Sequence, residues 1–350
     1  MDRQPFISVI IPVYNMSKYL NQCLDALIAS SYKSCEIIVV DDASTDDSAE
    51  ISRKKGVTVL QMPHQSGPAA VRNYGAQKAR GDILFFVDSD VLVQQETITR
   101  IVTDFQKNPD ITAVFGSYDD DPAEKDFFSQ YKNLYHHSVH QKSSNDAVTF
   151  WAGCGAMRRD VFHEVGGFDQ KKYTKPSIED IELGYRLRRM GYRILLDKQL
   201  QVKHLKHWGW SSWLKTDIFN RAVPWSQLIL ERGFLPQDLN LQVSHKISAV
   251  LVFLLIIMLP LTLLGALNFL VTNINSVFIS ISLLLIISLL LLNRNLYAFF
   301  FHKRGIKFLL FAIPLHFLYY LYSGLTFATC WILHKFSLFI IDLKKVKTLI

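Results

Sequence analysis

Residues 81–90 read GDILFFVDSD, in which the apolar run Ile83–Val87 is followed at once by Asp88, Ser89 and Asp90. An apolar run of this length, bounded by polar residues, is typical of a strand that is buried on both faces of a sheet. Working outward from it, similar runs predict further strands over 7–11, 36–40, 57–60 and 193–196.

Helical patterns lie between these strands. Residues 16–29 place apolar side chains at spacings of three and four, a polar stretch at 43–48 opens a second helix, and 67–79 forms a third. Residues 181–190 predict another helix, which Gly191 ends. Strands that alternate with helices predict an α/β domain with a parallel sheet covered by helices on both faces.

Four acids follow predicted strands directly: Asp41, Asp42, Asp88 and Asp90. Ligands of open parallel sheets bind at the carboxyl edge, so we expect these acids to converge there. Asp88 and Asp90 could hold a divalent cation together with phosphate oxygens, or could cap a helix or form a turn. Asp42 could accept hydrogen bonds from a nucleobase or ribose, or could cap the helix beyond Ser44.

Two further segments carry groups suited to transfer chemistry. Arg72 lies in the small-residue stretch 67–73, where a ligand could approach the backbone and the guanidinium could bind a phosphate or base; a surface arginine is the alternative. Glu179 and Asp180 begin a helix and could deprotonate an acceptor hydroxyl. The alternative is that they favour the helix N-terminus electrostatically, with Ser177 and Asp180 at capping-box spacing.

A basic, aromatic segment follows at 203–213. His204 or His207 could be a further metal ligand. The same segment could lie at a membrane surface through Trp208, Trp210 and Trp213. Arg221 could bind a leaving diphosphate or could face solvent or lipid. We interpret His136, His137 and His140 as a polar helix face, and an aromatic stripe at 127–135 as the apolar face of that helix.

The net charge of +7 is unevenly distributed. Residues 1–246 are neutral, whereas 247–350 hold eight Lys or Arg and one acid, Asp342. Because the excess flanks apolar segments, it indicates anionic lipid headgroups and no nucleic acid as partner. The four cysteines lack metal-like spacing and no signal peptide is apparent, so we expect free thiols in a reducing compartment.

The sequence therefore predicts two domains: 1–240, a catalytic domain, and 241–350, a membrane anchor of two or three hydrophobic helices. Residues 249–271 are long enough to span a bilayer, and 277–292 form the return limb. The basic connection 293–307 would then lie inside, as would the catalytic domain. Residues 309–332 are either a third span or a re-entrant or interfacial hairpin. The spans hold almost no ionisable residues, which argues against a transporter.

Seven motifs resemble family 2 glycosyltransferases, in order and at the usual separations. They are SVIIPVYN (8–15), VDDASTD (40–46), GPAAVRNYG (67–75), GDILFFVDSD (81–90), GCGAMRR (153–159), GGFD (166–169) and IEDIELGYRLRRMG (178–191). The resemblance covers about residues 6–225. It implies a GT-A fold, which is a Rossmann-like, mostly parallel sheet, with a nucleotide-sugar donor, Mn²⁺ or Mg²⁺, and an inverting single displacement.

The resemblance also implies roles for individual residues. Pro12 and Tyr14 would line the nucleotide pocket, Asp42 would contact the base or ribose, and Arg72 would lie near the nucleotide. Asp88 would face the ribose or sugar, Asp90 would bind the metal, and Asp180 would be the catalytic base, supported by Glu179. From the residues themselves, we expect His204 as a further metal ligand and Arg221 at the donor diphosphate. The chain lacks the QxxRW motif of processive synthases, for which Arg221 and Trp225 are a loose substitute.

We therefore expect a bacterial, multi-pass enzyme of the inner (plasma) membrane with a cytoplasmic catalytic domain. It would move a sugar, most readily from a UDP-sugar, to a lipid-linked or membrane acceptor in envelope glycan or glycolipid synthesis. The alternatives are a polyprenyl-phosphate glycosyltransferase and a non-catalytic scaffold of the same fold. The sequence leaves the sugar, the nucleotide, the acceptor and the oligomeric state open.

Overall fold

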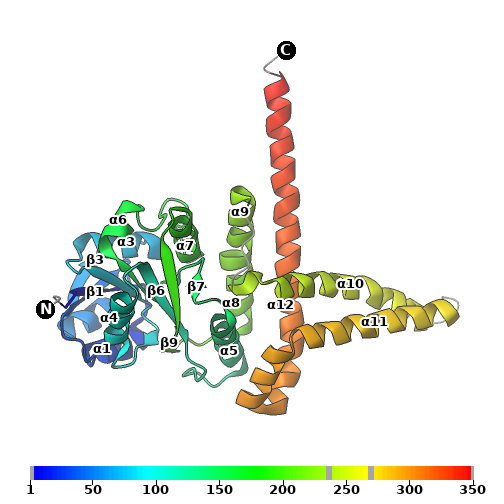
Figure 1. Ribbon diagram of the computed structural model, residues 1–350, viewed down its shortest axis with the longest axis horizontal. Helices are drawn as coiled ribbons and strands as arrows, with labels where there is room; N and C mark the ends of the chain where they lie inside the picture. The colour runs from blue at the N-terminus through cyan, green and yellow to red at the C-terminus, as the bar shows by residue number, and fades with distance from the viewer. Residues whose placement is uncertain (1–3, 234–238, 267–271, 348–350) are drawn as a thin grey trace. The chain divides into compact units, whose positions relative to one another are not determined.

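The computed structural model describes residues 4–233, 239–266 and 272–347. The chain divides into two compact units, one up to Trp213 and one from Leu214 onward. The first holds the mixed sheet and the second holds the long apolar helices (Figure 1). The functional boundary that we expected near residue 240 stays a prediction.

The sheet of the first unit has the strand order β3-β2-β1-β4-β8-β6-β9-β5. Its first four strands are parallel: β3 (Thr58–Gln61), β2 (Cys35–Asp41), β1 (Ile7–Val13) and β4 (Ile83–Val87). This half is the Rossmann-like core that the alternating pattern predicts. The carboxyl ends of β1, β2 and β4 consequently meet at one edge.

The other half of the sheet is mixed rather than parallel. β8 (Cys154–Arg158) runs antiparallel to both β4 and β6 (Ile111–Tyr118). β9 (Arg193–His204) is parallel to β6, and two short strands pair with it in the antiparallel sense: β5 (Val91–Leu92) and β7 (Asp146–Ala147). The sequence pattern does not reveal this half, because the strands that pair lie far apart along the chain.

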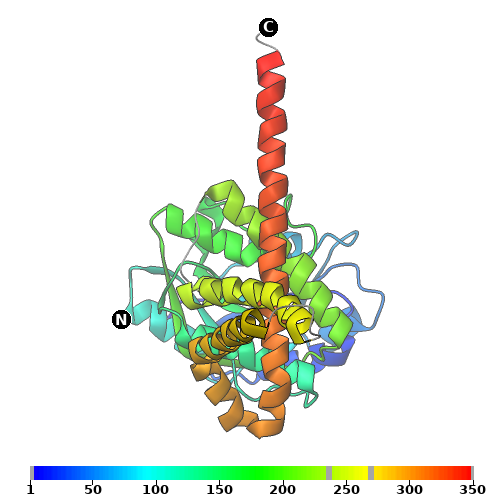
Figure 2. The same ribbon diagram turned by 90° about the vertical axis from the view of Figure 1, so that its right-hand side faces the viewer.

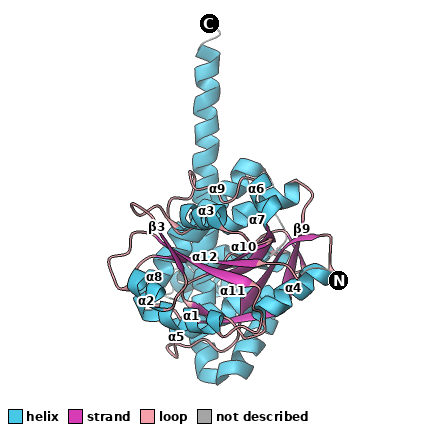
Figure 3. Ribbon diagram, turned by 90° about the vertical axis from the view of Figure 1, so that its left-hand side faces the viewer, coloured by secondary structure: helices cyan, strands magenta, loops and turns pink. Residues whose placement is uncertain are grey.

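Helices cover both faces of the sheet. In Figures 1 and 3, α1 and α4 lie on one face, and α3, α6 and α7 lie on the other. The helices of the first unit are α1 (Ser17–Ile28), α2 (Ser48–Lys54), α3 (Pro68–Lys78), α4 (Thr97–Lys107), α5 (Phe127–Lys142), α6 (Arg159–Glu164) and α7 (Glu179–Arg189).

The alternation of strand side chains explains this two-sided packing. Ile7, Val9 and Ile11 join the core beneath α1 and α4, to which those helices contribute residues such as Leu24 and Ile101. Ile10 points to the other face, toward α3. There a Cβ on Gly75 would lie 2.6 Å from the Ile10 Cγ2 atom, so only glycine lets α3 approach β1 this closely.

The second unit is helical. It contains η1, a π-helix at Thr216–Ala222, and η2, a 3-10 helix at Leu239–Leu241, together with α9 (Val223–Arg232), α10 (Val243–Ala266), α11 (Thr272–Leu292) and α12 (Arg294–Lys347). The short helix α8 (Trp210–Lys215) contains the division between the units. Three stretches, 243–264, 275–292 and 294–336, are apolar and long enough to cross a membrane. The expected apolar segments are thus helical, although the end of the first one, 267–271, lies outside the described residues.

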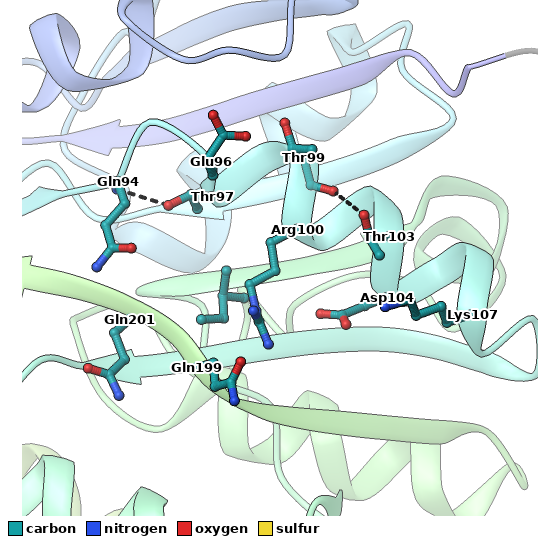
Figure 4. A pocket seen from close by; sticks show the side chains of 11 residues that line it. Gln94, Glu96, Thr97, Thr99, Arg100, Thr103, Asp104, Lys107, Gln199 and Gln201 are labelled. Carbon is teal, nitrogen blue, oxygen red and sulfur yellow. Dashed lines mark hydrogen bonds between the residues drawn. The ribbon is translucent and has the colours of Figure 1, made fainter.

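A polar pocket lies between α4 and β9 (Figure 4). Arg100 of α4 reaches across to Asp197 of β9, with its Nη2 atom 2.9 Å from the Oδ1 atom. Burial, together with the negative charge of Asp197, raises the pKa of the nearby Asp104 to about 7. Asp104 is therefore held in a position that favours its neutral form.

We predict that Asp104→Asn raises the melting temperature relative to wild type, by an amount that grows between about pH 4 and about pH 7. The pKa of Asp104 is raised on folding, so the folded state binds its proton more tightly and wild-type stability falls as the pH rises toward the folded pKa. Asparagine mimics the neutral carboxyl and should remove this loss. Thermal unfolding of the full chain at each pH measures it. A pH-independent difference, or an equal effect of the exposed control Asp47→Asn, would contradict the expectation.

Candidate active site

The predicted acids do lie at the carboxyl edge of the parallel strands. Asp42 directly follows β2, Asp88 directly follows β4, and Asp90 lies in the turn before β5. The start of α7, with Glu179 and Asp180, is linked to this edge through Arg72 of α3. The structure therefore brings together five predicted side chains from segments that are distant in sequence, namely Arg72, Asp88, Asp90, Glu179 and Asp180.

Arg72 is the link between these segments. Its Nη2 atom donates to the Asp88 carboxylate at 2.7 Å, and its Nη1 atom donates to the Glu179 carboxylate at 2.9 Å. The side chain is only 5% exposed, and its guanidinium lies 5.6 Å from the centre of the Phe168 ring. Arg72 is therefore a buried bridge between two carboxylates, and the surface-arginine alternative is wrong.

Asp180 lies beside this bridge. Its Oδ2 atom accepts a hydrogen bond of 3.1 Å from the backbone N–H of Ala152. Burial and the neighbouring charge of Glu179 raise the pKa of Asp180 to about 7. A carboxyl group with a pKa near the working pH is suited to accept a proton from an acceptor hydroxyl.

The capping-box alternative for this helix is wrong. The N-cap of α7 is Ile178, which makes no side-chain cap. The N–H of Ser177 instead donates to the second carboxylate oxygen of Glu179 at 3.0 Å. Both oxygens of Glu179 are thus occupied within the protein, whereas Asp180 is only half-buried. Of the two acids, Asp180 is the one that a substrate can approach.

Asp90 is the more buried of the two acids in the turn at 88–90, at 8% exposure. Burial and the charge of Asp88 raise the pKa of Asp90 to about 6. Pairing of β5 with β9 brings His204 next to it, with the imidazole Nε2 atom 3.8 Å from the Asp90 Oδ2 atom. His207 lies elsewhere, 3.6 Å from Asp126, so His204 is the histidine beside the turn.

The residues of this turn fit a divalent cation. A buried carboxylate whose pKa is raised by a second carboxylate holds negative charge that a cation would compensate. Within the described parts of the chain, no group of three or more His, Cys, Asp and Glu forms a metal site. Asp90 and His204 would therefore supply only part of a coordination shell, and phosphate oxygens and water would have to complete it.

Asp42 holds the loop before α3. Its two carboxylate oxygens accept hydrogen bonds from the backbone N–H groups of Ser66, at 2.7 Å, and Gly67, at 2.9 Å. It does not cap α2, whose N-cap is Asp47. Gly67 has φ +86°, and a Cβ there would lie 2.3 Å from the Thr174 carbonyl oxygen. Close backbone packing therefore explains why position 67, in the small-residue stretch 67–70, is a glycine.

The remaining predicted residues differ in their surroundings. Pro12 is near the end of β1, paired in register with Val40, and Tyr14 follows the strand with 41% exposure. Both therefore adjoin the same sheet edge. Arg221 belongs to the second unit, where it lies 3.6 Å from Asp217, and its diphosphate role stays a prediction.

The histidines of α5 do not form a polar surface, contrary to the sequence interpretation. His137 and His140 are buried, and their Nδ1 atoms lie 2.8 Å and 3.1 Å from the carbonyl oxygens of Tyr118 and Gly116. Burial lowers the pKa of His140 to about 4. Sequence spacing cannot reveal this, because α5 is enclosed by partners from β6 and β9.

Rings beside the acidic turn were also missed. The Tyr118 ring stacks on His204, with centroids 4.3 Å apart, and packs edge-on to Trp151 at 4.8 Å. Trp151 immediately precedes Ala152, whose N–H binds Asp180. These rings fix the imidazole of His204 in place. The only signal in the sequence was the position of Trp151 just before the motif at 153–159.

The expected membrane-surface role of the tryptophans is largely wrong. Trp208 is 6% exposed and Trp213 is 1% exposed. Within the first unit, Trp213 packs on Phe128 and Tyr131 of α5. Only Trp210, at 46% exposure, presents a large apolar surface. The aromatic stripe of α5 and the tryptophan segment therefore mainly cover one another.

Comparison with known proteins agrees with this geometry. Residues 8–166 match the family model described as glycosyl transferase family 2. An uncharacterised glycosyltransferase of Haemophilus influenzae is 42% identical over 101 residues, covering 27% of this chain and 40% of that protein. Glycosyltransferase GlyG of Streptococcus pneumoniae is 37% identical over 117 residues, covering 32% of this chain and 38% of that protein. The matches thus span less than half the length of these relatives.

The fold has a counterpart among solved structures. S. aureus TarS 1–349, in complex with UDP-GlcNAc, superposes with a TM-score of 0.50 at 20% identity, covering 65% of this chain and 66% of that one. Its likeness concerns the fold alone. Together with the motif series, the mixed sheet and the acids at its edge, these matches show that residues 8–166 form a glycosyl transferase family 2 domain and that the first unit has a GT-A fold.

Proposed function

We propose that this chain is an inverting, metal-dependent transferase that moves a sugar from a nucleotide-sugar to a hydroxyl of a lipid-linked or membrane-associated acceptor. The observation that carries the proposal is the Arg72 bridge, which sets the acidic turn and the start of α7 side by side. A donor-binding group and a proton acceptor are thereby held within one site. The apolar C-terminal helices support a membrane-associated acceptor.

The residues of the edge have complementary tasks in this proposal. Pro12, Tyr14 and the Asp42 loop would receive the nucleotide, and Asp88 would face the ribose or sugar. Asp90 and His204 would hold a divalent cation, which when bound neutralises charge on the departing diphosphate. Arg221 would add positive charge to the diphosphate if η1 meets this edge.

Asp180 would act on the acceptor. As the hydroxyl oxygen attacks the anomeric carbon, Asp180 takes its proton and the bond from that carbon to the diphosphate oxygen breaks. A single displacement of this kind inverts the anomeric configuration. Glu179 holds the guanidinium of Arg72 and does not itself need to meet the substrate.

The donor and acceptor classes rest on weaker support. TarS, which shares the fold, was crystallised with UDP-GlcNAc, and this favours testing UDP-sugars first. We propose a cytoplasmic catalytic domain and a multi-pass inner-membrane anchor, because the basic residues flank the apolar helices. A screen of the purified full-length protein with UDP-, GDP- and dTDP-sugars, with and without Mn²⁺, would identify the donor. No turnover or donor hydrolysis with any of them would sink the proposal.

A polyprenyl phosphate is the second candidate acceptor. It would present a phosphate oxygen in place of a hydroxyl, and the product would be a lipid-phosphate sugar. The same membrane helices favour it. Mass spectrometry of the lipid product distinguishes the two, because only one acceptor gains a sugar on phosphate. A scaffold role would be favoured instead if neither lipid class gained a sugar.

We predict that the transfer rate at saturating donor rises with pH through about 7, and that Asp180→Asn lowers it by a factor on the order of 10²–10⁴. The raised pKa of Asp180 means that the carboxyl must lose a proton before it can act as a base. The pH–rate profile and the affinity for the nucleotide are measured for each variant. Asp160→Asn, an exposed carboxyl on α6, is the matched control. Undiminished transfer by Asp180→Asn would remove the base assignment.

Replacing Arg72 with methionine should lower the free energy of unfolding by about 3–5 kcal/mol, because the buried Glu179 would lose its charged partner. Arg72→Lys keeps the charge, yet its compact ammonium cannot reproduce the two-carboxylate bridge. We therefore expect Arg72→Lys to fold but to transfer sugar at least about tenfold more slowly. Chemical denaturation and rate measurements test both effects.

The control for this pair is Lys54→Met, which removes an ion pair with Glu50 in which both side chains are exposed, at 74% and 60%. Its effect on stability should be within about 1 kcal/mol, as for surface pairs in general. Equal losses at positions 72 and 54 would show that burial of the Arg72 bridge has no special weight.

Asp90→Asn should weaken Mn²⁺ binding in the presence of UDP. Metal binding by the wild type should strengthen as the pH rises past about 6, because the raised pKa of Asp90 makes protons compete with the cation. Electron paramagnetic resonance of free Mn²⁺ reports the affinity without any need for turnover. Asp160→Asn again serves as control, and an Asp90→Asn variant that binds Mn²⁺ like wild type would exclude this residue as a ligand.

A further inference from the structure

The helices of the second unit do not form a simple bundle of parallel spans. In Figure 1, the α10–α11 hairpin and α12 run in different directions. In Figure 2, the hairpin is foreshortened whereas α12 is seen at full length. Thus α12 crosses the hairpin instead of lying along it.

The described contacts of α12 with the hairpin include a cluster near its open end. Near the start of α10, Ser248 accepts a hydrogen bond of 3.1 Å from Asn293, which follows the last residue of α11. Tyr320 of α12 donates to the same Asn293 at 2.7 Å and packs with Val252, Leu255 and Leu289. Exposed side chains occupy the rest of the hairpin, among them Leu263, Leu264, Ile279, Leu283 and Leu284.

Residues on opposite faces of α12 meet different partners. Tyr320 and Gly324, one turn apart, face the hairpin, and a Cβ on Gly324 would lie 2.5 Å from the Phe253 ring. Tyr322 is two residues from each and therefore points the other way. Its hydroxyl donates to Asp217 of η1 at 2.8 Å. Within this unit, α12 thus lies between the hairpin and η1.

The length of α12 exceeds what a single span requires. Gly305, with φ +77° and ψ −177°, breaks the helix, so a continuous segment runs from 306 to 347. At about 1.5 Å per residue it would be about 60 Å long. The hydrocarbon core of a bilayer is only about 30 Å thick. The length of a helix that lies in the plane of the membrane is not limited by the thickness of the bilayer.

The composition and charge near the crossing suit the membrane–water interface. Tyr319, Tyr320, Tyr322 and Trp331 lie on this segment, and Tyr and Trp concentrate at bilayer interfaces. The crossing lies beside the open end of the hairpin, where 294–307 carries four basic residues and no acid. Basic residues favour the cytoplasmic leaflet and its anionic headgroups.

We propose that residues 306–347 lie in the plane of the membrane, in the headgroup region of the cytoplasmic leaflet, and do not form a third span. The inference rests on α10 and α11 crossing the bilayer as a hairpin. Its surface partner is the lipid itself. Lys344, Lys345 and Lys347 then stay on the cytoplasmic side together with 294–307, and both ends of α12 lie on one side of the membrane.

The first test maps sidedness in the full-length protein. Single cysteines replace Lys303 and Asn275 in separate variants, and a membrane-impermeant maleimide is applied to intact spheroplasts and to inside-out vesicles. A C-terminal green fluorescent protein or alkaline phosphatase fusion reports the last residues without any substitution. We expect label from outside only at position 275, label on 303 only in inside-out vesicles, and a fluorescent, phosphatase-inactive C-terminus. A C-terminus outside the cell, or a position 275 that is closed from outside, overturns the proposal.

The second test measures depth and does not depend on sidedness. Cysteine replaces Trp331, Ile332, Leu333 and His334 one at a time in a Cys330→Ser background, and each cysteine carries a spin label. The exposure of each label to oxygen and to a water-soluble nickel complex is measured in vesicles of phosphatidylglycerol and phosphatidylethanolamine. These four side chains span one helical turn. If the helix lies in the plane of the membrane, the immersion depth of the labels should vary with the 3.6-residue period of the helix. Labels in the next turn, at 335–338, should then have the same mean depth as those at 331–334. A steady change of depth from 331 to 338 would show a span and overturn the proposal.

Discussion

A buried guanidinium holds the candidate active site together. Arg72 comes from α3, and its two carboxylate partners come from the end of β4 and the start of α7. If either Asp88 or Glu179 moved away, the buried charge of Arg72 would lose one of its two partners, which is strongly unfavourable in a folded protein. The position of α7 relative to the sheet, and with it the position of Asp180, follows from this constraint.

The same site contains two carboxyl groups whose pKa values are raised. Burial raises the pKa of Asp90 and of Asp180, and the neighbouring charges of Asp88 and Glu179 raise them further. The consequences differ because the surroundings differ. Asp90 is buried with His204 beside it, which suits a bound cation, whereas Asp180 is half-buried and held by a backbone N–H, which suits a proton acceptor.

The packing of the second unit depends on a different interaction, a set of hydrogen bonds at Asn293. Asn293 joins α10, α11 and α12 through hydrogen bonds at one point, and polar groups buried among apolar helices are costly to leave without partners. This arrangement selects one crossing point among the many that apolar surfaces would allow. Gly324 lets the helices approach closely at the same place.

Much of the fold and of the site was determined by the sequence alone. The apolar run at 83–87, the helices between the strands and the acids that follow β2 and β4 are local patterns, and the motif series identified the family before any packing was known. Apolar runs, helical periodicity and charge distribution depend on neighbours along the chain, which is why they can be read without a structure.

Only the tertiary structure decided the rest. Contacts between segments that are far apart in sequence decide four features. These are the antiparallel pairing of β8, the position of His204 rather than His207 beside Asp90, the burial of His140 and Trp213, and the direction of α12. A histidine or tryptophan has the same local pattern whether it meets solvent, lipid or another ring. Its surroundings, and therefore its pKa and its role, are set by which distant segment packs against it.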